Sequence, residues 1–198
     1  DKIYSSLFMQ PGVQLFSVYH QPFIIPAARF VQPIHAGKAL SNIDLGLQGD
    51  DTGNHISGKN GSYSELTVLY WIWKNWDRSK FPYWGLVHYR RYFCKDVFPG
   101  SITNKRIYHY AATQTEVDKV INDSLHQKLL NSLQQNDVVL PKLMYSYRKK
   151  GVIKSIEEHY KATHIAAHWD VMITVLKELY PQYTESLPFF QQSKMSYF

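Results

Sequence analysis

One continuous stretch, residues 49–93, constrains the fold of this chain most strongly, because it contains a predicted loop, helix and strand in succession. The loop spans residues 46–61 and is rich in glycine, aspartate and asparagine, so little regular structure is expected there. Apolar residues then recur at helical spacing and predict one buried helix face, formed by Leu66, Leu69, Tyr70 and Trp73. Residues 83–93 are predicted to form a strand centred on Leu86 and Val87.

The predicted helix has recognisable start and stop signals. Ser62 is the expected N-cap, and Glu65 follows three residues later, as in a capping box. Lys74 and Asn75 fall in the last turn, where a cation and a C-cap residue are favourable. Because the cap accounts for Glu65, the sequence gives that residue no chemical role.

The predicted strand ends in His88-Tyr89-Arg90-Arg91. Strand alternation would place His88 and Arg90 on one face of the sheet, and Tyr89 and Arg91 on the other. Open α/β sheets bind ligands outside the carboxyl ends of their strands, and arginine forks suit phosphate oxygens. An arginine pair that forms salt bridges with a nearby carboxylate is the alternative. We favour the phosphate site.

The segment before the loop adds a further strand. Residues 13–19 are β-rich and predict a buried strand that stops before Pro22, and extended pieces between prolines follow. The segment His35-Ala-Gly-Lys38 is similar to a phosphate loop but lacks the upstream glycine, and Ala39 stands where Ser or Thr is needed. A solvated Lys38 is therefore favoured over a phosphate ligand on spacing alone.

Downstream of residues 94–112, which are expected to be irregular, two more helices are predicted. Capping boxes begin at Thr113 and at Ser155, and the two helical regions would reach about residue 134 and Pro181. The first of these helices would turn four apolar residues inward: Val117, Val120, Ile121 and Leu125. Residues 137–141 are predicted to form a short buried strand, and residues 145–150 a basic, aromatic loop.

Strands that alternate with helices favour an α/β fold with a mainly parallel sheet. No repeat or linker divides the 198 residues, so one domain, residues 1–198, is expected. Hydrophobic content of 44% and charged content of 19% are typical of a globular protein. The net charge of +6 favours anionic partners. The single cysteine, Cys94, excludes an internal disulfide framework and suits a reducing compartment.

Three polar clusters each allow more than one interpretation. Asp50 and Asp51 could bind a divalent metal, bond to ribose or sugar hydroxyls, or serve as a base, but a pair of Asx turns explains them better on spacing alone. His164 and His168 have the i, i+4 spacing of a zinc site, yet no third ligand is evident. The basic loop at residues 145–150 could contact phosphate or remain solvated.

Several motifs taken together resemble one known family. They are VYHQPF near the start, ALSNIDLGLQGDDTG, ELT-LYW-WKN, GL-HYRRYF, and the Tyr160–His164 segment. On these motifs the chain resembles a bacterial family, described as a domain of unknown function, that occurs in capsular and exopolysaccharide biosynthesis proteins and is regarded as a glycosyltransferase. The resemblance covers roughly residues 13–183.

This resemblance implies a GT-A-like, Rossmann-related fold that transfers a sugar from a nucleotide-sugar donor. A UDP-sugar is the favoured donor, and a surface polysaccharide or lipid-linked glycan the acceptor. Many GT-A enzymes end a helix–strand unit in an Asp-x-Asp motif that holds Mn²⁺ or Mg²⁺, whereas here the unit ends in residues 88–91, His-Tyr-Arg-Arg. We hypothesise that the histidine and the two arginines of this segment bind the diphosphate directly. If a metal is needed instead, Asp50 and Asp51 would hold it.

The predicted donor site follows from this comparison. The end of the first strand and the 48–54 loop would frame the nucleotide and sugar, and Asp51 is the predicted catalytic carboxylate facing the transferred sugar. The residues predicted to bind the donor are Tyr19, His20, Lys38, Asp50, Thr52, Asn54, His88, Arg90 and Arg91.

Members of the family usually continue past the last residue of this chain, so a C-terminal part, and with it a catalytic base, is expected to be missing. A cytoplasmic location is expected, with peripheral contact at the inner face of the cytoplasmic membrane, where a basic surface favours anionic lipid. The main alternative is a non-catalytic module that binds nucleic acid or glycan through a basic, aromatic surface. For the enzyme, no nucleic acid partner is expected. A domain that has lost catalysis and serves as a scaffold is a third interpretation.

Overall fold

A computed structural model describes residues 12–77, 79, 81–93, 113–140, 144–145, 147–149 and 152–196. The chain divides into two compact units, Asp1–Val139 and Leu140–Phe198. Within the described ranges, no helix combines the length and the apolar content needed to cross a bilayer.

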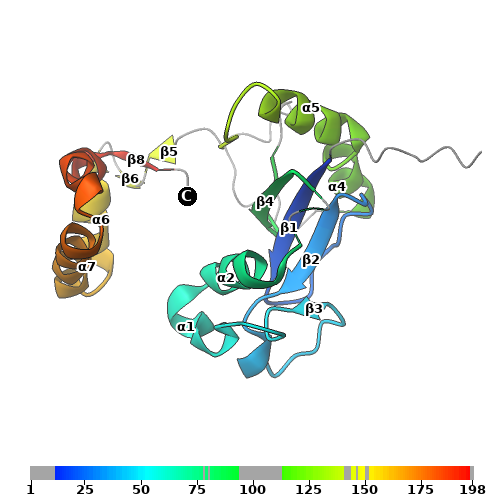
Figure 1. Cartoon of the computed structure of the whole chain (residues 1–198), viewed down its shortest axis with the longest axis horizontal. Coiled ribbons are helices and arrows are strands. Elements are labelled where there is room, and N and C mark those ends of the chain that lie inside the picture. Colours follow the sequence, from blue (N-terminus) through cyan, green and yellow to red (C-terminus); the bar gives the residue numbers. More distant parts are fainter. Residues whose placement is uncertain are drawn as a thin grey trace, which may run out of the picture. The chain divides into compact units, whose positions relative to one another are not determined.

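The first unit is built on a four-stranded parallel sheet in the order β3-β2-β1-β4 (Figure 1). The strands are β1 (Val13–Tyr19), β2 (Val31–His35), β3 (Gln48–Gly49) and β4 (Tyr83–His88). Strand β1 pairs in parallel with both β2 and β4, so that Ser17 lies opposite Pro33 on one side and Val87 on the other. Because all four strands run in one direction, their C-terminal ends lie at one edge of the sheet, which we call the carboxyl edge.

Both faces of the sheet are covered, which explains why β1 is buried along its whole length. Helices α4 (Gln114–Val120) and α5 (Asp123–Leu133) pack on one face, against Val13 and Leu15. Helix α2 (Leu66–Asn75) packs on the other, against Phe16 and Val18. Figure 1 shows these helices on opposite sides of the strands. The predicted mainly parallel α/β sheet is thereby confirmed.

Short helical turns connect β2 to α2: η1 (Lys38–Leu40), η2 (Ser57–Lys59) and α1 (Asn60–Tyr63). The predicted capping box at Ser62 is wrong, because Ser62 lies inside α1 and neither α1 nor α2 has a side-chain cap. Helix α1 ends at Tyr63, Ser64 after it has a positive φ of 46°, and Glu65 precedes α2. Glu65 therefore stands at the N-cap position of α2, but its side chain makes no capping hydrogen bond.

The predicted buried face of α2 is also wrong. Leu66 and Trp73 are 54% and 55% exposed. The face against the sheet is instead formed by Thr67, Val68, Trp71 and Ile72. The helix carries two apolar stripes, and the one that packs on the sheet also contains the polar Thr67, which finds a buried partner at the end of β3.

The two downstream capping boxes form as predicted. The side chain of Thr113 accepts from Glu116, and that of Ser155 from Glu158, and each glutamate bonds back to its cap. However, the helix after Thr113 is not continuous, because a new N-cap at Asn122 separates α4 from α5.

Ile121 and Leu125 are buried as predicted, and Val117 and Val120 pack against the same cluster while half-buried. Residues 137–140 form no strand, and Val138 is 60% exposed. The segment 94–112, including Cys94, lies outside the described residues.

The second unit contains helices and two small antiparallel pairs. Its elements are β5 (Met144–Tyr145), β6 (Tyr147–Lys149), β7 (Val152–Lys154), α6 (Ile156–Thr163), α7 (Ala166–Leu179), η3 (Pro181–Ser186), α8 (Leu187–Gln192) and β8 (Met195–Ser196). The predicted loop at 145–150 contains β6, which pairs with β7, and the predicted long helix breaks at His164.

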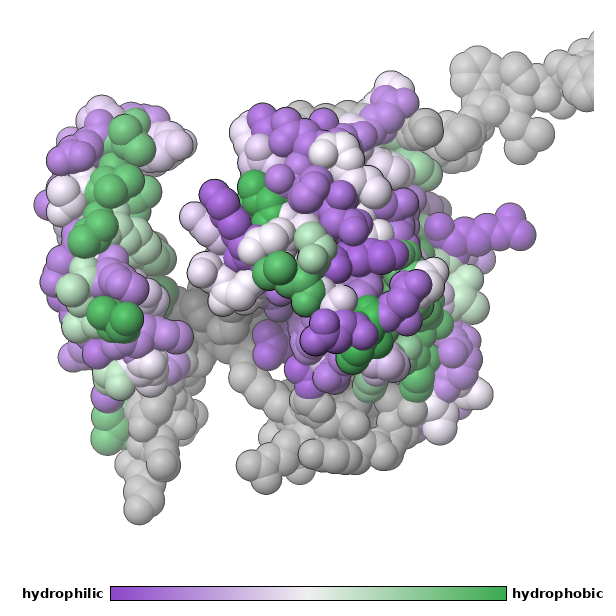
Figure 2. Space-filling view, turned by 90° about the horizontal axis from the view of Figure 1, so that it is seen from below, coloured by the Kyte–Doolittle hydropathy of each residue, from purple (hydrophilic) through white to green (hydrophobic). Residues whose placement is uncertain are grey.

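The core of this unit is formed by Trp169, Ile173 and Leu187. Other apolar side chains remain exposed, among them Val171, Leu179 and Phe189. In Figure 2, green side chains run along the surface of the helical unit on the left.

Candidate functional site

The carboxyl edge brings the predicted donor residues together from all four strands. Tyr19 and His20 stand at the end of β1, Lys38 follows β2, Asp50 and Asp51 follow β3, and His88 to Arg91 stand at the end of β4. The order β3-β2-β1-β4 reverses between β1 and β4. That reversal is a topological switch point, the position at which open α/β sheets bind ligands.

Asp50 is fully buried and is engaged by four donors of the chain itself. Backbone N–H groups of Gly37 and Lys38 donate to its oxygens at 3.0 and 3.2 Å. The hydroxyls of Ser57 and Thr67 donate at 2.5 and 2.6 Å. Asp50 therefore has no surface left for a nucleotide, and the predicted direct contact with the donor is corrected: the residue holds the loop, η2 and α2 in place.

The rest of the loop is held against the outer part of α2. Trp71 Nε1 donates to the carbonyl and the hydroxyl of Thr52, at 3.0 and 3.1 Å. The side-chain amide of Asn75 accepts from the Asn54 N–H at 2.9 Å and donates to the Asn54 carbonyl at 2.8 Å. Gly53, with φ of 61°, lies so close to Asn75 that a Cβ would overlap its amide oxygen. These bonds give Thr52 and Asn54 a structural task, while both remain exposed.

Asp51 and Lys38 lie beside each other at Gly49, where a Cβ would overlap both side chains. Lys38 Nζ donates to the Leu47 carbonyl at 3.3 Å and lies 3.6 Å from Asp44 Oδ1. The lysine is thus directed toward its own loop. Asp51 is half-buried and remains a carboxylate at the carboxyl edge.

The chain turns sharply after β4, so the predicted alternation through Arg91 is wrong. The Arg91 N–H donates to the His88 carbonyl at 2.8 Å, which closes the turn. Tyr89 is fully buried there, with its ring centroid 5.5 Å from that of Tyr19 and 5.2 Å from that of His20. The amide of Gln21 donates to the Tyr89 hydroxyl at 2.8 Å. Tyr89 therefore connects the ends of β1 and β4 across the switch point.

Arg90 and Arg91 both belong to this turn. The Arg90 guanidinium lies 4.7 Å from the centroid of the Tyr89 ring, a cation–π arrangement that orients it. Arg91 is exposed. Planar guanidinium groups at the switch point suit an anion with several oxygens, such as a diphosphate.

His88 differs from the prediction that it is a phosphate-binding cation. Burial lowers the pKa of its imidazole to about 4, and the charge of Glu65, which acts in the opposite direction, is outweighed. Arg90, Arg91 and His20 lower the pKa further. His88 is therefore neutral near pH 7, and its Nε2 lies 3.6 Å from Glu65 Oε1.

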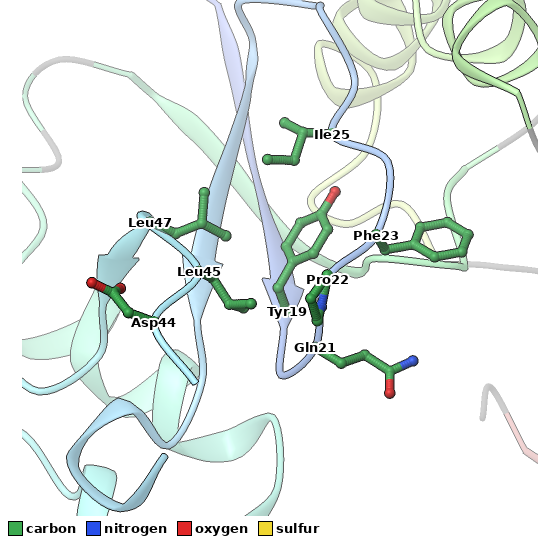
Figure 3. A pocket seen from close by; sticks show the side chains of 8 residues that line it. All are labelled: Tyr19, Gln21, Pro22, Phe23, Ile25, Asp44, Leu45 and Leu47. Carbon is green, nitrogen blue, oxygen red and sulfur yellow. The ribbon is translucent and has the colours of Figure 1, made fainter. Parts of the chain in front are cut away.

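A pocket of about 290 Å³ opens beside the end of β1 (Figure 3). In Figure 3 the ring of Tyr19 and the side chains of Leu45 and Leu47 face one another, with Ile25 above them, while Asp44 and Phe23 point away. The Tyr19 hydroxyl donates to the Ile24 carbonyl at 2.9 Å. Burial and the adjacent Tyr92 hydroxyl raise the pKa of the Tyr19 phenol, so it stays neutral. The pocket offers an apolar surface of a size that suits a flat ring.

The carboxylates of this edge do not fit the metal site of an Asp-x-Asp motif. Both oxygens of Asp50 are taken by donors, so Asp50 and Asp51 cannot act together as the two carboxylates of an Asp-x-Asp motif. No group of three or more His, Cys, Asp or Glu side chains placed to hold a metal ion occurs among the residues that the structure describes.

Sequence reasoning did not assign three residues at this edge. Tyr89 and Gln21 connect β1 to β4, and Glu65 faces His88. A further residue, His35, is fully buried at the end of β2, and neither of its ring nitrogens has a hydrogen-bond partner within the described ranges. Burial, followed by the charge of Lys38, lowers the pKa of His35.

Comparison with known proteins places the chain in a family. The family model described as "Domain of unknown function (DUF4422)" matches residues 14–198, and the chain belongs to this family. The match extends over both compact units. No curated protein matches the chain.

Among solved structures, the chain is similar to the apo structure of the WbbM bifunctional glycosyltransferase, with 28% sequence identity and a TM-score of 0.78. The match covers 94% of this chain and 32% of that chain, so this chain spans about a third of the solved protein. Together with the parallel sheet, this likeness confirms the predicted α/β, GT-A-like fold class.

Proposed function

We propose that this chain is a glycosyltransferase domain that transfers a sugar from a nucleotide-sugar donor to a glycan. The observation that carries the proposal is the likeness to the WbbM bifunctional glycosyltransferase over 94% of the chain. The arginine pair at the switch point between β1 and β4 supports it, because a donor diphosphate is an anion that guanidinium groups bind well.

In the proposed complex, Arg90 and Arg91 bind the diphosphate, and the nucleoside extends toward the pocket beside Tyr19. His20, exposed between them, and Asp51 contact the sugar or ribose hydroxyls. A UDP-sugar is the proposed donor, because a pyrimidine is a small flat ring and the pocket has a volume of about 290 Å³. His88 and Asp50 have positioning roles in this arrangement.

The leaving group of the reaction is a nucleoside diphosphate. When the bond between the anomeric carbon and the phosphate oxygen breaks, negative charge develops on that oxygen. Fixed guanidinium groups stabilise this charge without reorganisation. We therefore propose that transfer needs no divalent metal, in agreement with the lack of free paired carboxylates at Asp50 and Asp51.

The proposed acceptor is a growing surface polysaccharide or a lipid-linked glycan of a bacterial capsular or exopolysaccharide pathway. We also propose a cytoplasmic location with peripheral contact at the inner face of the membrane. The net charge of +6 supports this location, because basic residues are attracted to anionic lipids.

A thermal-shift screen tests the donor site. UDP, GDP, UDP-glucose and UDP-galactose are added with EDTA or with Mn²⁺, and the midpoint of unfolding is measured. A UDP-linked stabilisation that EDTA leaves intact and Arg90→Ala abolishes is expected, since a ligand bound only to the folded state raises its stability. Arg29→Ala is the matched control, because Arg29 is exposed just before β2, at the opposite edge of the sheet.

Two outcomes would contradict the proposal. Equal stabilisation of the Arg90→Ala variant would remove the arginine pair from the donor site. Steeply salt-dependent binding of RNA without any nucleotide effect would favour the alternative, a non-catalytic nucleic-acid-binding module. Stabilisation that appears only with Mn²⁺ would contradict the metal-independent reaction.

A further inference from the structure

Glu65 is a carboxylate at the carboxyl edge whose side chain makes no capping bond among the residues that the structure describes. It stands directly before α2, where no side-chain cap forms, and its side chain is 46% exposed. One carboxylate oxygen lies 3.6 Å from Nε2 of His88, whose side chain is only 14% exposed. An accessible carboxylate is thus paired with a largely buried imidazole next to the arginine turn.

One hydrogen bond to the His88 ring favours a particular tautomer. The Arg90 N–H donates to Nδ1 at 3.4 Å, so Nδ1 is the acceptor nitrogen of the ring. The neutral imidazole then carries its proton on Nε2, the atom that faces Glu65. His88 therefore presents an N–H group to the carboxylate and restricts where it can lie, without neutralising its charge.

The other charged and titratable groups near this pair come from the ends of β1 and β4. Arg90, Arg91 and His20 act on His88, and burial keeps its pKa low in spite of Glu65. His20 and His88 have ring centroids 6.2 Å apart. Because the imidazole of His88 is neutral, it does not form a full ion pair with the carboxylate of Glu65.

We infer that Glu65 is the catalytic base, which takes the proton of the incoming hydroxyl, and that His88 is the positioning residue that orients it. This inference rests on the proposed glycosyltransferase function. The acceptor O–H proton passes to a Glu65 carboxylate oxygen, while the acceptor oxygen forms a bond to the anomeric carbon. The bond from that carbon to the diphosphate oxygen breaks, and its electron pair leaves with the nucleoside diphosphate held by Arg90 and Arg91. Glu65 then releases the proton to water.

Position favours Glu65 over Asp51 for this task. The reacting carbon is bonded directly to the diphosphate, so the base must lie close to the arginine turn. Asp51 follows β3, and the order β3-β2-β1-β4 puts three strand spacings between β3 and β4, roughly 14 Å in total. Glu65 instead lies against His88, the last residue of β4.

The test compares Glu65→Gln, Glu65→Asp and Asp51→Asn in the full chain. Release of UDP from UDP-glucose and UDP-galactose is measured in a hydrolysis assay, in which water replaces the acceptor hydroxyl. The thermal shift caused by UDP is measured for each variant as well. We expect Glu65→Gln to lower kcat by about 100-fold or more, with the UDP shift intact and partial recovery in Glu65→Asp. Asp51→Asn should change KM more than kcat. Glu178→Gln, an exposed glutamate of α7, is the control.

The pH dependence separates a base from a merely structural residue. In the unsubstituted chain kcat/KM should have an acid limb, and this limb should vanish from the residual activity of Glu65→Gln. His88→Phe removes the Nε2–H that faces the carboxylate, so kcat should fall while the thermal shift by UDP stays intact. The thermal shift by UDP confirms that each variant is folded.

Near-normal kcat in Glu65→Gln, or loss of kcat in Asp51→Asn with Glu65→Gln unaffected, would overturn the assignment while leaving the proposed function in place. Failure of the proposed function looks different. The unsubstituted chain would then show neither a UDP-linked thermal shift nor UDP release, and both proposals would be overturned.

Discussion

The hydroxyl of Thr67 donates a 2.6 Å hydrogen bond to Oδ2 of Asp50, which ties the first turn of α2 to the end of β3. Neither atom reaches the surface. The first unit therefore depends on a buried carboxyl group whose donors come from three separate segments: residues 37–38, Ser57 and Thr67.

Replacement of Asp50 is expected to destabilise the first unit strongly. Asp50→Asn turns one acceptor oxygen into a donor that faces other donors, so the free energy of unfolding should fall by about 2–4 kcal/mol. Urea denaturation measures it, with the exposed Asp137→Asn as control. A double-mutant cycle with Thr67→Val should give a coupling of about 1 kcal/mol or more. Independent effects of the two substitutions would contradict the bond.

Two glycines in the same region should respond to alanine in opposite directions. Gly53→Ala places a side chain on a left-handed residue and against Asn75, so a loss of about 1–3 kcal/mol is expected. Gly61 lies inside α1 with open space around it, and Gly61→Ala should stabilise by about 0.5–1 kcal/mol. Chemical denaturation of the two variants side by side checks the sign, and a stabilised Gly53→Ala would contradict the described loop.

Acid should weaken the fold through His88. The folded pKa is about 4 and the ordinary value is 6.5, so the unfolded chain binds a proton in this window while the folded chain does not. The contribution of His88 to the free energy of unfolding is therefore fully present above the ordinary pKa of 6.5. It is lost as pH falls toward the folded pKa, by up to about 3 kcal/mol. Urea midpoints at about pH 7.5 and about pH 5 should differ less in His88→Gln than in the unsubstituted chain. The exposed His168→Gln should leave the difference unchanged.

Two Ser-x-x-Glu patterns in the chain should give different results when the serine is removed. Ser155→Ala removes an N-cap whose hydroxyl accepts from Glu158 at 3.1 Å, and should destabilise the second unit by about 1 kcal/mol. Ser62→Ala removes no cap, because Ser62 lies inside α1. Hydrogen exchange of α6 and α1 amides measures each effect locally. Faster exchange in Ser62→Ala than in Ser155→Ala would contradict these assignments.

The same pair of patterns shows what the sequence could predict. Residues 13–19 form a strand because their apolar, β-rich run is buried on both faces, and the mostly half-buried residues 83–88 pair with it in parallel. The parallel order then collects polar residues at one edge. The boxes at Thr113 and Ser155 form because a helix begins directly after each of them, of 7 and 8 residues. At Ser62 the chain first closes a single turn, α1, and Ser64, whose φ is positive, separates it from α2.

Other features depended on tertiary contacts that local patterns do not encode. Helix α2 has two apolar stripes, and only the buried partner of Thr67 shows which of them faces the sheet. Glu65 fitted a cap, so its contact with His88 appeared only in three dimensions. Asp50 and Asp51 are neighbours in sequence, yet Asp50 is fully buried and bonded to internal donors, whereas Asp51 is half-buried.

The central place of β1 in the sheet has a consequence for synthesis of the chain. Its partner β2 follows almost at once, whereas β4, which covers its other edge, begins only at Tyr83. While the chain emerges from the ribosome, the uncharged segment Val13–Tyr19 therefore presents open backbone N–H and C=O groups along one side. Until β4 is synthesised, this edge is open to pairing with other nascent chains, and we expect β1 to be the segment most prone to aggregation during expression.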